Sequence, residues 1–113
     1  MSSLHKPEKL FLDIRMAIED IEKFCHGLTK EAFLANGLVQ AAVERKLGII
    51  GEAVSQLARQ FPAEAARLPD HKKIIGLRNI IVHAYDVIDP EIVWEIVSDH
   101  LPALMEAVRK TLP

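Results

Sequence analysis

One short stretch of the chain brings together side chains that can move protons and bind phosphate. Arg78, His83 and Tyr85 lie within eight residues of one another in the otherwise apolar run GLRNIIVHAYDVIDP. Histidine has the unperturbed pKa closest to neutrality, so it can act as an acid or a base near pH 7. Arginine binds phosphate oxygens in a bidentate geometry and stabilises negative charge on them. The two residue types together indicate phosphate chemistry that needs no metal ion.

RNA cleavage is the reaction that suits this pair best, because RNA carries its own nucleophile, the 2′-hydroxyl group. A base takes the proton of that hydroxyl, an acid protonates the leaving 5′-oxygen, and a fixed cation stabilises the phosphorane. The alternative is a structural role, with Arg78 in an ion pair and His83 hydrogen-bonded at the margin of the core. On the spacing of the two residues alone, the structural role is favoured.

The geometry of a straight helix separates the two groups. Five residues correspond to about 140° of rotation, so Arg78 and His83 do not share a helix face. Arg78 and Tyr85 do share a face if the helix persists that far. We therefore expect a helix through about His83 and then a turn to Pro90, or a site that a second protomer completes across a symmetric dimer interface.

Two further polar residues are candidates for supporting roles. Asn79 follows Arg78 directly, and Glu52 lies on the preceding long helix beside its apolar stripe. Gly48 and Gly51 on that helix should permit another helix to approach closely, which places Glu52 to pair with Arg78 and orient it. Solvated surface positions are the alternative for both residues.

The elements that must position these groups are helices, because apolar residues recur at steps of three and four along most of the chain. Long amphipathic helices are predicted over about residues 7–26, 39–61 and 90–108, with shorter helical pieces after Thr29 and between Pro62 and Pro69. Thr29, Asp70 and Asp89 are expected to cap helices. Pro102 should kink or interrupt the last helix.

These elements predict an all-α fold, an antiparallel bundle of four to five helices with a kinked C-terminal helix. The run IIVHAYDVI is β-branched enough for a strand, but no partner strand is in view, so helix is favoured. The chain of 113 residues fits a single domain over residues 1–113. Trp94 is expected to pack at a helix or dimer interface.

The composition of the chain limits how it could bind nucleic acid, a membrane or a metal ion. The formal net charge of −2 means that any nucleic acid would be bound at a local site rather than over a basic surface. A single cysteine, the lack of a long apolar run and an N-terminus unlike a signal peptide favour a cytoplasmic protein without a membrane partner. The other histidines lack metal-ligand spacing, so we expect no metal and no other cofactor.

The whole string RNIIVHAY is more specific than the pair of residues within it. It resembles the R-x4-H-x-Y signature of the HepT-like toxins, within the HEPN superfamily. The flanks GEAVSQL at 51–57, IIGLRN before the motif and DPEIVWEIV at 89–97 are also similar to the family pattern. The resemblance extends over essentially the whole chain in length and helix order, and it reverses the preference for a structural role of Arg78 and His83.

The resemblance implies a HEPN-type bundle that forms a homodimer, in which the motifs of two protomers line a shared cleft. It implies a metal-independent endoribonuclease that acts as the toxin of a type II toxin–antitoxin system. The partner would be an MNT-type nucleotidyltransferase antitoxin, which adds AMP to the motif tyrosine. Carried over by residue, Arg78 and His83 are catalytic, Asn79 supports them and Tyr85 is modified.

A second hypothesis is a non-catalytic HEPN subunit that binds a partner nucleotidyltransferase and presents Tyr85 or a substrate to it. The low net charge and Asp86, which adds a carboxylate beside the proposed phosphate site, favour this alternative modestly. A third is a plain dimerising helical module, in which Arg78 and His83 affect only stability.

Overall fold

The computed structural model describes residues 6–82 and 88–112, and over residues 77–82 it describes the backbone alone. Within that part of the chain every regular element is a helix, so the predicted all-α class is confirmed. The elements in chain order are α1 (Pro7–Cys25), α2 (Lys30–Leu34), α3 (Gly37–Gln60), α4 (Pro62–Ala65), α5 (His71–Val82), α6 (Pro90–Glu95), the π-helical turn η2 (Ile96–His100) and α7 (Leu101–Thr111).

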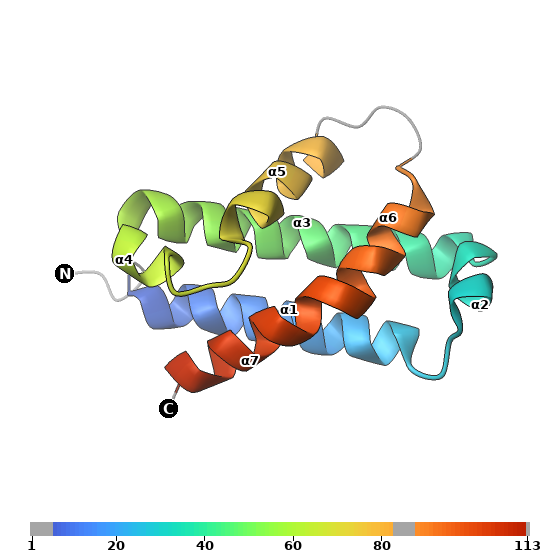
Figure 1. Ribbon diagram of the computed structural model, residues 1–113, viewed down its shortest axis with the longest axis horizontal. Helices are drawn as coiled ribbons and strands as arrows, with labels where there is room; N and C mark the ends of the chain where they lie inside the picture. The colour runs from blue at the N-terminus through green and yellow to red at the C-terminus, as the bar shows by residue number, and fades with distance from the viewer. Residues whose placement is uncertain (1–5, 83–87, 113) are drawn as a thin grey trace.

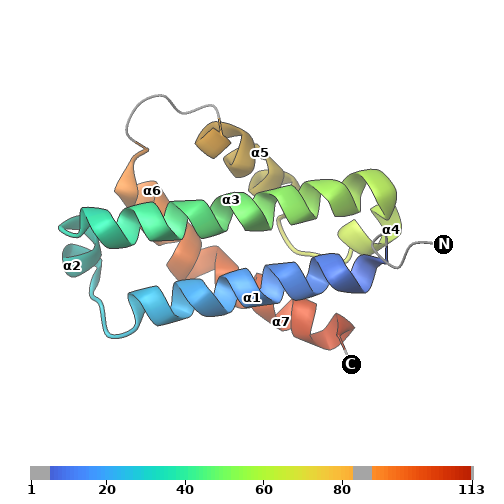
Figure 2. The same cartoon turned by 180° about the vertical axis from the view of Figure 1, so that it is seen from behind.

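The helices form two layers (Figures 1 and 2). Helices α1 and α3 lie side by side and antiparallel, and together they make one layer. On the other side, α6, η2 and α7 continue into one another as a long rod that crosses this pair, and α5 lies along α3 beside the start of the rod. The two ends of the described chain, by α1 and α7, lie at the same end of the molecule. This is the predicted antiparallel bundle.

The core lies between the two layers. Its fully buried side chains come from the predicted stripes of α1, α3 and the C-terminal rod, chiefly Phe11, Ile14, Ile18, Ile21, Val43, Leu47, Ile50, Val54, Leu57, Val93, Leu104 and Val108. One ion pair bridges the first layer, since the Lys46 ammonium lies 2.9 Å from the Asp20 carboxylate. That contact lowers the pKa of Asp20, because hydrogen bonding from Lys46 stabilises the charged carboxylate more than burial disfavours it.

Short polar side chains begin the helices where the sequence predicts. The Thr29 hydroxyl accepts a hydrogen bond from the Ala32 N–H at 3.1 Å, and the Asp89 carboxylate accepts one from the Glu91 N–H at 2.9 Å. Each bond satisfies a backbone donor that has no partner within the helix. After α1 the chain reverses through Gly27, whose φ of +77° suits glycine in particular.

The rod made by α6 and α7 is interrupted, as the position of Pro102 predicts. Proline has no N–H to donate and its ring collides with the carbonyl four residues earlier, which here belongs to Ser98. The chain widens into the π turn η2 just before this point, and the Leu101 N–H bonds the Ile96 carbonyl, five residues back. Pro102 then lies in the first turn of α7, where the missing donor costs little.

The ends of the second layer are held by specific contacts. Trp94 of α6 packs on Phe33 of α2, with ring centroids 5.2 Å apart and planes tilted by 42°, so the predicted helix interface is confirmed. Asp70 directly precedes α5, and its carbonyl accepts the Ile74 N–H at 3.0 Å. The Asp70 carboxylate, expected to cap that helix, instead bonds the imidazole of His100.

Candidate functional site

Helix α5 carries the first part of the predicted site. Its residues run from His71 to Val82, so the backbone of Arg78 and Asn79 belongs to its second half. The helix packs against α3, and Ile74 is the buried side chain that anchors its first half. The predicted helix through the motif arginine is confirmed up to Val82. The β-branched run from Ile80 to Val82 is therefore helical.

The remaining motif residues lie outside the described part of the chain. His83 follows the last described residue of α5, and Tyr85 and Asp86 come soon after it. Whether the imidazole reaches the face that bears the arginine, within one chain or across a dimer, thus stays a prediction. So do the roles proposed for Asn79 and Tyr85.

Glu52 lies on α3, the helix on which α5 packs. Its carboxylate is 3.9 Å from the guanidinium of Arg59, one of its contacts. The side chain of Arg78 is not among the described ones, so the predicted pairing of Glu52 with Arg78 stays a prediction. Because α3 and α5 are in contact, the two residues do belong to adjoining helices.

A cavity of about 650 Å³ lies along α1 and α3, and Glu52 is part of its wall. Three carboxylates line it, those of Asp13, Glu44 and Glu52, against the single guanidinium of Arg45. Burial raises the pKa of Glu44, since the charged form loses hydration there. Lys9 pairs with Asp13 at 2.6 Å, so Arg45 is the one cation among the described lining residues and the cavity offers a phosphate little attraction, which makes it a poor candidate for an RNA site.

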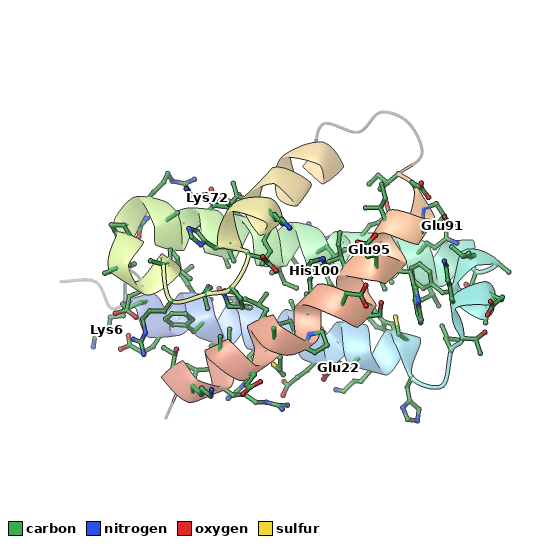
Figure 3. The ribbon with its side chains drawn as sticks, in the orientation of Figure 1. Lys6, Glu22, Lys72, Glu91, Glu95 and His100 are labelled. Atoms are coloured by element: carbon green, nitrogen blue, oxygen red, sulfur yellow. The ribbon has the colours of Figure 1, made fainter. Side chains whose placement is uncertain are left out.

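In the second layer, α5 and the α6–η2 segment, which we call its two arms, carry opposite surface charges. Lys72 and Lys73 are exposed in the first turn of α5. Glu91, Glu95 and Asp99 are exposed on α6 and η2. Figure 3 shows Lys72 and Glu91 well apart, with α5 and α6 between them. A nucleic-acid strand is therefore attracted to the α5 side and repelled from the α6 side.

Sequence reasoning missed a polar contact that joins these two arms. His100 Nδ1 lies 3.1 Å from Asp70 Oδ2, although the residues are 30 positions apart. Figure 3 labels His100 on the rod, where it meets the start of α5. A cleft of about 340 Å³ lies beside this contact, between α5 and the α6–η2 segment. Nothing in the local sequence pattern signals either feature, because both depend on how two distant helices cross.

The described residues contain no group of three or more His, Cys, Asp and Glu side chains placed to hold a metal ion. None of the described helices combines the length and apolar character needed to cross a bilayer. Within the described part of the chain, the candidate site comprises the backbone of Arg78 on α5 and the exposed lysines of that helix's first turn.

Comparison with known proteins places the chain in a family. Residues 14–111 match the family described as Ribonuclease HepT-like. The chain is 35% identical over 101 residues to “Putative RNase MJ1380” of Methanocaldococcus jannaschii, covering 88% of this chain and 92% of that protein. It is also 35% identical over 101 residues to “Probable ribonuclease HepT” of Thermococcus cleftensis, covering 87% of this chain and 91% of that protein. No solved structure matches the chain. The chain therefore belongs to the ribonuclease HepT-like family.

Proposed function

We propose that this protein is a metal-independent endoribonuclease, the toxin of a type II toxin–antitoxin system in the cytoplasm. The observation that carries the proposal is the placement of Arg78 on α5, with His83 directly after the described end of that helix, inside the segment that matches the family. The relatives named as ribonucleases support the same activity.

Each residue has a defined chemical role in this proposal. His83 removes the proton of the 2′-hydroxyl or protonates the leaving 5′-oxygen, and Arg78 binds the phosphorane oxygens. In a homodimer two copies of His83 reach one cleft, so one acts as base and the other as acid. Asn79 and Glu52 orient the arginine, which must be held in place to stabilise the transition state.

The test is RNA cleavage by the purified protein in EDTA. We expect products with 2′,3′-cyclic phosphate ends and a bell-shaped dependence of the rate on pH, because one imidazole must be neutral and the other charged. His83→Ala should abolish cleavage with the fold intact by circular dichroism. His26→Ala, which removes an exposed histidine just after α1, is the matched control and should keep full activity. Cleavage by the His83→Ala protein would rule out this mechanism.

The proposed partner is an MNT-type nucleotidyltransferase that transfers AMP to Tyr85 and so silences the nuclease. The phosphodiester adds a negative charge and bulk next to the phosphate site, which repels RNA. Incubation with that transferase and ATP should increase the intact mass by one AMP group, and Tyr85→Phe should remove the increase. An increase in mass in a protein that never cleaves RNA would instead support the non-catalytic subunit.

A further inference from the structure

The cleft between α5 and the α6–η2 segment has two chemically different parts. Ile74, Ile92 and Ile96 form apolar walls, and Asp70, Lys73 and His100 contribute polar groups. Its volume of about 340 Å³ is large enough for one flat heterocyclic ring with its sugar. Apolar walls with a few polar groups are the usual make-up of a small-ligand site.

The helices cross in a way that leaves apolar side chains of the cleft walls exposed to water. Ile92 is 50% exposed, one of only a few large apolar side chains that the described residues leave so open to water. The π turn brings Ile96 and His100 to the same cleft. Single π turns within α-helices are rare and often occur at functional sites. A ligand that covered Ile92 and Ile96 would remove apolar surface from water.

The polar side chains of the cleft have hydrogen-bonding atoms that are not used within the described part of the protein. In the described part of the chain, the bond from His100 Nδ1 to Asp70 Oδ2 is the one hydrogen bond of either side chain. Asp70 Oδ1 and His100 Nε2 are therefore available to a ligand. Asp70 also has a φ of +57°, which is uncommon for a residue other than glycine and is found more often at functional sites than elsewhere.

The positive charges on α5 and the negative charges on α6 favour one orientation of a nucleic-acid ligand in this cleft. Lys73 lines the cleft on the α5 side, and Lys72 beside it is exposed. On the other side, the carboxylates of Glu91 and Glu95 are exposed on α6. A phosphate backbone would therefore follow α5, and its base would point into the cleft between the two arms.

From these observations we infer that the cleft is a subsite for one nucleobase of single-stranded RNA whose phosphate backbone runs past the exposed lysines of α5. The inference rests on the proposed ribonuclease function. The isoleucine side chains contact the faces of the base, and Asp70 accepts hydrogen bonds from its edge. A carboxylate accepts from exocyclic amino groups, so the subsite prefers cytosine, adenine and guanine to uracil.

The direct test uses the full chain with 13C-labelled isoleucine methyl groups and does not depend on catalysis. Titration with cytidine 3′-monophosphate should shift the methyl signals of Ile74, Ile92 and Ile96, and uridine 3′-monophosphate should bind more weakly. The buried methyl groups of Ile14 and Ile21 on α1 should not move. Inorganic phosphate, as the comparison ligand, should leave the three cleft signals unchanged.

Kinetics with single-stranded RNA supply the second test. Ile92→Ser and Ile96→Ser should each raise KM about fivefold and leave kcat nearly unchanged, because an aliphatic wall is worth less than the aromatic stacking of other RNA sites. Leu38→Ser is the matched control, since Leu38 is 83% exposed on α3 and lies outside the cleft. It should leave both constants unchanged.

Asp70→Asn tests the proposed preference between bases. Asparagine tolerates a positive φ and keeps an oxygen that can accept from His100, so the fold should be retained. Its amide also has donors, and the preference for amino-bearing bases should therefore fall. A purely structural role for Asp70 would leave the ratio of kcat/KM for cytosine and uracil substrates unchanged.

The outcomes separate this inference from the proposed function. If the protein cuts no RNA but the nucleotide shifts the three methyl signals, the ribonuclease proposal fails and the base subsite stands. If the protein cuts RNA while the signals stay still and the serine variants keep their KM, the subsite is wrong. Signals that move equally with inorganic phosphate, or with protein concentration alone, would also overturn it, the latter by showing an interface between copies.

Discussion

The helix pair α1–α3 and the arms α5 and α6–η2 are built differently. The first pair contributes two apolar stripes to the core, in which residues such as Ile14 and Val54 are fully buried, and the cavity along it is lined by three carboxylates. The second pair meets through few apolar side chains and leaves a cleft, closed on one side by the Asp70–His100 contact. Among the described residues, no polar or charged side chain is buried in the core.

From this contrast we expect the first pair to determine stability and the second pair to determine activity. Fully buried apolar stripes exclude water from the core, so they contribute mainly to the free energy of folding. The second pair forms an incomplete interface, in which a cleft remains between the helices. Such an interface contributes less to stability but leaves space that polar groups can line. The motif arginine lies on α5, one of the helices of the incomplete interface. We therefore expect substitutions in the first pair to change stability and substitutions in the second to change activity.

The largest effect should come from the core of the first pair. Phe11 on α1 is 1% exposed, and Phe11→Ala should lower the free energy of unfolding by about 3–5 kcal/mol, because a large cavity replaces the ring. Urea unfolding followed by circular dichroism measures the change. Activity per folded molecule should stay the same.

Ile96→Ser on η2 is the matching change in the second pair. Ile96 is only partly buried, so its replacement should cost clearly less stability than Phe11→Ala, even as it raises KM. If Ile96→Ser destabilises the protein as much as Phe11→Ala, the separation between the two regions is wrong.

Local rules account for the features that the sequence predicts well. The stripes on α1 and α3 need only a repeat of three and four residues, and the caps at Thr29 and Asp89 need contacts two or three residues away. The interruption before Pro102 is equally local. Its form, a π turn rather than a kink or a break, was not predicted, because that choice depends on how the rod packs against α1 and α3.

The candidate site could be predicted only in part, since its geometry is not local. The family string around Arg78 and His83 supports the proposed chemistry, but which groups lie near them depends on contacts between distant parts of the chain. The Asp70–His100 contact spans 30 residues and has no periodic signal. The expected cap at Asp70 illustrates this, because its carboxylate bonds the distant imidazole.

A smaller effect is expected where the second pair begins, at the N-terminus of α6. Asp89→Ala removes the hydrogen bond to the Glu91 N–H and should lower the free energy of unfolding by about 1 kcal/mol. Asp89→Asn keeps an oxygen acceptor and should lose much less. Thermal unfolding of the two variants compares them. Equal losses would mean that the charge at the helix end, and not the cap, is what stabilises α6.

The smallest effect should appear in the first pair and only in acid. Hydrogen bonding from Lys46 lowers the pKa of Asp20 in the folded protein, so this carboxylate stabilises the fold at neutral pH. The contribution is present above the unfolded pKa of about 4 and is lost as the pH falls through the lower folded value.

Asp20→Asn should therefore flatten the fall in unfolding free energy between about pH 5 and pH 2, which urea titrations at several pH values would detect. Glu31→Gln, which removes an exposed carboxylate from α2, is the control and should keep the wild-type slope. If both variants have the wild-type slope, the Lys46–Asp20 contact does not join α1 to α3 in solution. The stability of the first pair would then come from its apolar stripes, which would sharpen its contrast with the cleft between α5 and the α6–η2 segment.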